Sequence, residues 1–128
     1  WDSIKSMYNY NQKKIDGSIL TFEAIHPRRS YAKTDNNNFV TEVAEKKVIS
    51  KNATVGVYYW KKGSNYVNCA ERMIKKDIRV NNEFYVCPVY NEAIGEGKKI
   101  VIDKVSEMHG LGTPDDLKNF ITKKNLVN

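Results

Sequence analysis

Apolar and polar residues alternate along several short stretches of the chain, and turn residues separate these stretches. The period-two alternation predicts strands at residues 18–25, 39–44 and 99–105. A further run, residues 53–60, carries no charge on either face, which predicts a strand covered on both sides inside a sheet. The turn residues 35–38 favour a hairpin just before the strand at 39–44.

Other stretches repeat their apolar residues every three or four positions, which is typical of helices. The first such stretch covers residues 1–14, can be capped by Asp2 or Ser3, and has an apolar set made of Trp1, Ile4, Met7 and Tyr8. The second covers residues 63–76, and its apolar stripe is predicted to face the core: Tyr66, Val67, Ala70, Met73 and Ile74.

Proline marks the start of two more helices. One begins at Cys87-Pro88 and ends near Gly95, and the last begins at Thr113-Pro114. The last helix has Leu117, Phe120 and Ile121 on one face, and residues 125–128 are expected to fray. Strands that alternate with helices predict an α/β fold, with a mixed β-sheet flanked by helices.

The composition fits one domain, residues 1–128. The chain has 128 residues, of which 41% are hydrophobic. It contains no apolar run long enough to span a membrane and no signal peptide, so a cytoplasmic location is expected. It also lacks an initiator Met, which favours a processed or excised fragment.

The net charge is +6, and lysine doublets are spread along the whole chain. Such a spread favours solvated surface over two alternatives, a site for small phosphorylated molecules and a polynucleotide surface. The two cysteines, Cys69 and Cys87, form neither a Cys-x-x-Cys pair nor a Cys/His cluster, so zinc is not expected. Buried free thiols are the simpler prediction, and a disulfide stays open.

Adjacent residues of opposite charge, Glu45 and Lys46, follow the strand at 39–44. A surface ion pair is the ordinary interpretation of such a dipeptide. At the exit of a buried strand, however, a lysine can also bind a phosphate group as a point charge. Arg28 and Arg29 are equally compatible with solvated charge and with attraction of a phosphate, whereas His26 is interpreted as a strand-end residue.

Four segments in order resemble the second half of the nucleotidyltransferases that make nucleotide sugars. They are HPRRSYAK, VTEVAEK followed after five residues by NATVGVYYW, NNEFYVCPVYNEAI, and GLGTPDDL. The resemblance implies a partial Rossmann-like nucleotidyltransferase fold. It also implies an enzyme that transfers a nucleotidyl group from a nucleoside triphosphate to a sugar 1-phosphate or another small phosphomonoester for surface polysaccharide synthesis.

The same resemblance implies roles for particular residues. Lys46 would be catalytic and bind the acceptor phosphate, while Glu45 would accept protons from sugar hydroxyls. The backbone at Ala32, where the family more often has glycine, would approach the acceptor. The other residues implied to contact the acceptor are Tyr31, Asn82, Glu83 and Tyr85.

The resemblance also shows what the chain lacks. The family's glycine-rich nucleotide loop and its main metal-binding aspartate lie upstream of the segments found here, and Gly110 stands where many members have a second metal ligand. Mg²⁺ is therefore expected only in the complete enzyme, and the chain alone is expected to be inactive. Two alternatives are a non-catalytic module that binds a sugar phosphate or a partner chain and, more weakly, a polyanion binder. Nucleic acid and membrane are not expected partners, and a homo-oligomer is left open.

Overall fold

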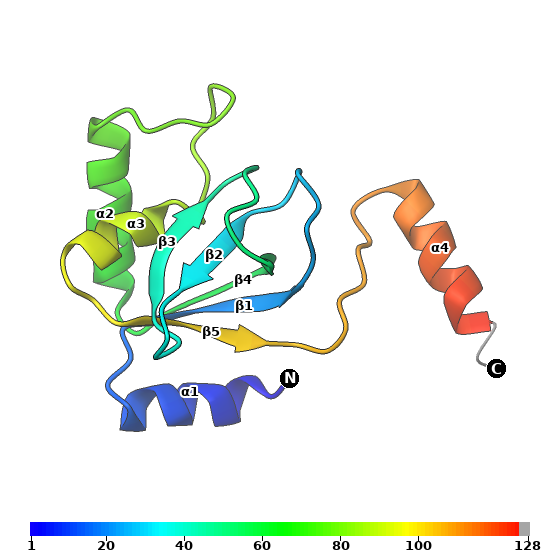
Figure 1. Ribbon diagram of the computed structural model, residues 1–128, viewed down its shortest axis with the longest axis horizontal. Coiled ribbons are helices and arrows are strands. Elements are labelled where there is room, and N and C mark those ends of the chain that lie inside the picture. Colours follow the sequence, from blue (N-terminus) through cyan, green and yellow to red (C-terminus); the bar gives the residue numbers. More distant parts are fainter. Residues whose placement is uncertain (126–128) are drawn as a thin grey trace.

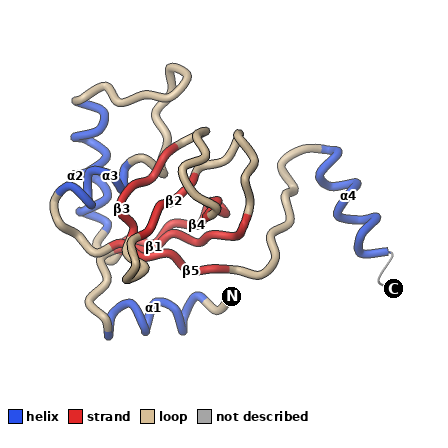
Figure 2. The backbone as a smooth tube through the Cα atoms, viewed as in Figure 1, coloured by secondary structure: helices blue, strands red, loops and turns tan. Residues whose placement is uncertain are grey.

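The computed structural model describes residues 1–125 and confirms the α/β fold, with a mixed sheet of five strands flanked by helices (Figures 1 and 2). The predicted domain continues to residue 128, and residues 126–128, with the fraying expected there, lie outside the described residues. The elements in chain order are α1 (Ser3–Gln12), β1 (Gly17–Glu23), β2 (Tyr31–Thr34), β3 (Val40–Ala44), β4 (Asn52–Trp60), α2 (Gly63–Lys75), α3 (Val89–Gly95), β5 (Ile100–Lys104) and α4 (Pro114–Asn125).

The strands lie in the order β3-β2-β4-β1-β5. β1 pairs antiparallel with β4 and parallel with β5, so the sheet is mixed. β2 pairs along its length with β3 but meets β4 only at Tyr31 and Ala53. Phe39, just before β3, forms a bridge with Val101 of β5. The sheet is therefore curled, and the tip of the β2–β3 hairpin lies beside β5.

Helices cover both faces of the sheet, as expected for a three-layer arrangement. On one face α2 and α3 bury an apolar cluster that includes Ile19, Met73 and Ala93. Within this cluster the ring of Tyr90 stacks on Trp60, with ring centroids 4.4 Å apart. On the other face lies α1 (Figure 1). It is attached through Tyr10, whose ring lies 5.1 Å from that of Tyr59. Neighbouring strand residues point to opposite faces, which is why Tyr59 and Trp60 contact different helices.

The predicted strands and helices are all present, with small shifts at their ends, and the hairpin predicted with its turn at residues 35–38 is confirmed, although its first strand was given no bounds. Residues 31–34, interpreted from the sequence as part of an acceptor-binding segment, form β2. β4 is less covered than its uncharged sequence suggests, since Val57 is 43% exposed.

Two helices place their apolar residues differently from the prediction. In α1 the apolar set is on the solvent side, with Ile4 80% exposed, and the residue that is buried is Tyr10. In α2 the buried positions are Cys69 and Met73, whereas Val67 and Ile74 are about half exposed. α4 has no buried residue and stands apart from the sheet (Figure 1). Within residues 1–125, no helix combines the length and the apolar character needed to cross a membrane.

Candidate functional site

The register of the β2–β3 hairpin places the predicted acidic and basic residues beside the start of β2. Tyr31 pairs with Ala44, so the next residues outward, Ser30 and Glu45, face each other. The hydroxyl of Ser30 donates a hydrogen bond of 2.5 Å to Oε2 of Glu45. One residue further, the backbone N–H of Lys46 donates to the carbonyl of Arg29 at 3.1 Å. The hairpin thus continues past the strands and holds the Glu45 carboxylate in one orientation.

Lys46 is held at both its backbone and its side chain. Its φ of 54° is in the left-handed region, where a residue without a glycine's freedom is unusual. Its Nζ donates to the hydroxyl of Tyr85 at 2.6 Å and lies 4.7 Å from the centre of that ring. The hydrogen bond with Tyr85 is the main cause that raises the pKa of Lys46, and the charges of Glu83 and Glu45 add to it. The side chain is therefore a positioned cation at neutral pH.

An open cavity of about 320 Å³ lies beside this cluster. Arg28 and Arg29 contribute to one part of its wall, and Glu45 and Tyr85 to another. The guanidinium of Arg29 lies 4.8 Å from the centre of the Phe22 ring, which fixes it by a cation–π contact. Arg28 and Arg29 line this cavity together with a single carboxylate, that of Glu45, so the charge of its wall favours an anionic ligand.

The inner wall of the cavity is neutral. It includes Tyr58 and Cys87, and burial raises the pKa of each to about 12. The hydroxyls of Tyr58 and Thr54 lie 3.2 Å apart and share a hydrogen bond. A thiol with so high a pKa is protonated at neutral pH, so Cys87 is a packing residue and a poor nucleophile.

Tyr31 and Ala32 lie behind the cavity. Both side chains are fully buried, at 0% exposure. The hydroxyl of Tyr31 donates to the carbonyl of His26 at 2.6 Å, and the carbonyl of Ala32 accepts from Ser50 and Asn52. In this structure both residues support the hairpin, and their contact with an acceptor stays a prediction.

Asn82 and Glu83 lie on an exposed turn that two backbone hydrogen bonds close between Val80 and Glu83. Asn82 has a φ of 63°, and its carbonyl accepts from Arg79 at 3.1 Å. Neither residue lines the cavity next to Glu45, although Glu83 is near enough to act on the pKa of Lys46. The structure thus brings together Glu45, Lys46 and Tyr85, with Glu83 at the edge, and leaves Asn82 outside.

Sequence patterns did not point to Ser30, Tyr58 or Cys87 as part of this site. Ser30 could have been found from the hairpin register, because the pairing of residues 31 and 44 fixes the partner of Glu45. Tyr58 and Cys87 give no such signal, since each resembles an ordinary core residue. Both cysteines are free and buried.

The fit to Mg²⁺ is poor within the described residues. Among residues 1–125, no group of three or more His, Cys, Asp or Glu is placed to hold a metal ion. Near Gly110 the carboxylate of Asp116 lies 3.7 Å from where a Cβ on this glycine would be. Mg²⁺ is usually bound by one or two carboxylates, waters and substrate phosphates, so this lone carboxylate does not define a site.

Solved structures with the same arrangement of strands and helices define the class of fold: the chain has part of the fold of the sugar nucleotidyltransferases. A nucleoside-diphosphate-sugar pyrophosphorylase from Vibrio cholerae RC9 aligns with a TM-score of 0.81 and 23% identity, over 95% of this chain and 50% of that one.

Two further structures show the same fold. A protein described as a glucose-1-phosphate thymidylyltransferase from Bacillus anthracis, in complex with sucrose, aligns with a TM-score of 0.66 and 18% identity, over 93% of this chain and 48% of that one. A CMP:2-keto-3-deoxy-manno-octonic acid synthetase complexed with CTP aligns with a TM-score of 0.61 and 10% identity, over 95% and 54%. The chain therefore spans about half the length of these proteins. No protein-family model and no curated protein sequence matches it.

Proposed function

We propose that this chain is the acceptor-binding half of a nucleotidyltransferase. The complete enzyme would transfer a nucleotidyl group from a nucleoside triphosphate to a sugar 1-phosphate or another small phosphomonoester, and release pyrophosphate. A phosphate oxygen of the acceptor would attack the α-phosphorus of the nucleotide. Such a reaction depends mainly on positioning and on neutralising charge, so few reactive side chains are required.

The observation that carries the proposal is a cavity lined by the fixed carboxylate of Glu45 and by Tyr85, whose hydroxyl accepts a hydrogen bond from the exposed Lys46 ammonium. Lys46 would bind the acceptor phosphate as the catalytic cation, assisted by Arg28 and Arg29. Glu45, oriented by Ser30, would accept hydrogen bonds from sugar hydroxyls. Tyr85 holds Lys46 in place and would contact the acceptor from the same side.

Further parts of the proposal rest on the resemblance and the fold. Mg²⁺ would neutralise phosphate charge in the complete enzyme, with ligands that the described residues do not supply. Tyr31, Ala32, Asn82 and Glu83 would approach the acceptor when it is bound. The product would be a nucleotide sugar made in the cytoplasm for surface polysaccharide synthesis.

The experiment is a titration of the 15N-labelled chain with glucose 1-phosphate, followed by two-dimensional NMR of the backbone amides. We expect saturable shifts at residues 28–30, 45–46 and 85, with a dissociation constant in the millimolar range for one small polar ligand. Inorganic phosphate should shift the same amides more weakly, because it lacks the hydroxyls that Glu45 would bind. Absence of saturable shifts at these amides contradicts the proposal.

A further inference from the structure

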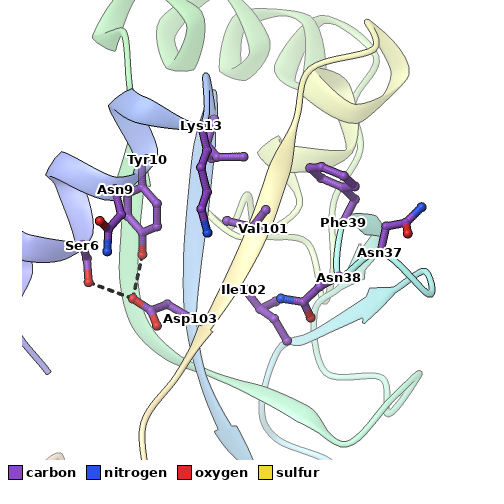
Figure 3. A pocket seen from close by; sticks show the side chains of 11 residues that line it. Ser6, Asn9, Tyr10, Lys13, Asn37, Asn38, Phe39, Val101, Ile102 and Asp103 are labelled. Atoms are coloured by element: carbon purple, nitrogen blue, oxygen red, sulfur yellow. Dashed lines mark hydrogen bonds between the residues drawn. The ribbon is translucent and has the colours of Figure 1, made fainter.

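A second cavity, of about 430 Å³, lies between α1, the tip of the β2–β3 hairpin and the edge strand β5. Figure 3 shows Asn9, Tyr10 and Asp103 on one side of it, Asn38 and Phe39 on the other, and Val101 and Ile102 of β5 between them. The Lys46 site is at the opposite end of β3, a strand of 5 residues. At about 3.3 Å per residue, the strand alone separates the two cavities by roughly 16 Å.

Asp103 is fixed on the wall of this second cavity. Its Oδ2 accepts hydrogen bonds from Nε1 of Trp1 at 2.7 Å, from the hydroxyl of Ser6 at 2.9 Å and from the hydroxyl of Tyr10 at 2.7 Å. Within residues 1–125, its Oδ1 accepts no hydrogen bond. One carboxylate oxygen is therefore anchored, and the other is available to a ligand.

Four more polar side chains border the same space, and one of them is Asn37 at the hairpin tip. The side chains of Asn9, Lys13 and Asn38 line the cavity, and in the described part of the chain none of them forms a hydrogen bond or an ion pair. Asn38 has a φ of 67°, and Figure 3 shows its amide directed toward β5. Each asparagine amide offers both donors and an acceptor, so the rim can pair with hydroxyl groups of either role.

The balance of charge and surface limits the class of ligand. Lys13 and Asp103 carry opposite charges that cancel, so the cavity does not favour a phosphate or a polyanion, unlike the site near Lys46. Phe39, Val101 and Ile102 add apolar surface that can pack against C–H groups. A ligand whose ring has neighbouring hydroxyls and apolar C–H faces would match both the polar and the apolar side chains of the cavity.

We propose that the cavity between α1, the hairpin tip and β5 binds a neutral sugar of monosaccharide size. Asp103 accepts hydrogen bonds from its hydroxyls, Asn9 and Asn38 bind hydroxyls from the opposite sides, and Phe39 packs on the ring. The volume is within the range of small-molecule sites, and it exceeds that of the cavity near Lys46. The occupant carries no phosphate, so this site is separate from the proposed acceptor site.

The test is a titration of the 15N-labelled chain with glucose, galactose and N-acetylglucosamine, each to roughly 100 mM, a range suited to a weak small ligand. At least one sugar should produce saturable shifts of the side-chain amides of Asn9 and Asn38 and of the backbone amides of β5. Inorganic phosphate should leave these signals unchanged. Saturation of the same signals by phosphate, or no saturable shift with any of the three sugars, overturns the proposal.

A matched pair of variants on α1 tests the role of the asparagine amide. Asn9→Ala should weaken sugar binding about tenfold, as expected for the loss of a hydrogen-bonding group. Asn11→Ala, on the same helix but outside the cavity, should change the dissociation constant less than about twofold. Both variants favour the helix, since alanine has the higher propensity, and the spectra verify that each is folded. Equal affinity in the two variants overturns the proposal.

Discussion

The hydroxyl of Tyr90 joins α3 to two strands of the sheet, and its removal offers a quantitative test of the core. This hydroxyl donates to the carbonyl of Tyr59 at 2.8 Å and is 3.1 Å from the carbonyl of Ser18. The side chain is fully buried, and burial raises its pKa. In Tyr90→Phe the ring keeps its stack on Trp60, but the two carbonyls lose their shared donor.

The expected cost follows from the geometry. One hydroxyl proton serves two acceptors, so the variant loses about one net hydrogen bond and leaves a buried carbonyl less well satisfied. Together these effects lower the free energy of unfolding by about 1–2 kcal/mol. With a urea m-value of about 2 kcal/mol/M for a chain of this size, the midpoint falls by roughly 0.5–1 M.

The assay is urea unfolding followed by circular dichroism, with Tyr66→Phe as the control. Tyr66 also packs against Trp60, with ring centroids 5.5 Å apart, but its hydroxyl forms no hydrogen bond within residues 1–125. The control should shift the midpoint by less than about 0.2 M, which is the size of a neutral substitution. A loss in Tyr90→Phe no larger than in the control would refute the importance given to this hydroxyl.

Three further predictions concern other parts of the fold. Gly17→Ala should lower the free energy of unfolding by about 1–3 kcal/mol in thermal melts, because the added Cβ would lie 2.9 Å from Cδ1 of Ile100. Gly63→Ala is its control, since no atom lies within 4 Å of a Cβ added there. Cys87, with a pKa of about 12, should resist iodoacetamide at pH 8 and react only in urea, as mass spectrometry would reveal. Asp103 loses hydration by burial, yet its hydrogen bonds from Tyr10, Trp1 and Ser6 hold its pKa below the usual 3.8. The ionised Asp103 carboxylate therefore stabilises the fold fully above pH 3.8, and this contribution is lost as the pH falls through the lowered pKa. The melting temperature should then fall more steeply in acid for the wild type than for Asp103→Asn. Equal slopes for the two proteins would contradict this.

Local patterns were enough to predict most of the secondary structure, because alternation and capping are properties of short segments. The hairpin turn at residues 35–38 implied β2, but its bounds could not be predicted, since its 4 residues include one exposed lysine and its buried positions depend on pairing with β3. Alternation identified β1 and β3 as strands but not their buried faces, because β1 is buried on both faces from Gly17 to Thr21 and the buried residues of β3, Val40 and Val43, are three positions apart.

Helix faces were harder to predict, because the partner of a helix is not encoded in the helix itself. In α1 the apolar residues indicated one buried face, yet the helix attaches by Tyr10, whose hydroxyl bonds to Asp103 far along the chain. In α4 the apolar residues Leu117 and Ile121 predicted a packed face, but both are about half exposed.

The candidate site was predicted in part. Glu45 and Lys46 were found from their position after a strand, and Tyr85 from the resemblance, and the structure brings these residues together. Ser30, which orients Glu45, requires the hairpin register, and the sugar-sized cavity beside α1 requires the curl that joins Phe39 to Val101. Distant pairings of this kind cannot be read from local periodicity.

The proposed function depends above all on Lys46 as the residue that binds a phosphate group. The decisive measurement compares the dissociation constants of glucose 1-phosphate for Lys46→Met and Lys47→Met by NMR titration. Methionine keeps the length of the side chain and the same backbone restriction as lysine at a φ of 54°, so the substitution removes the ammonium, with its charge and its contacts with Tyr85, and leaves the backbone unchanged. We predict that Lys46→Met weakens binding by at least about fivefold while Lys47→Met stays within about twofold of the wild type. Equal affinities for the two variants would contradict the proposed role of Lys46.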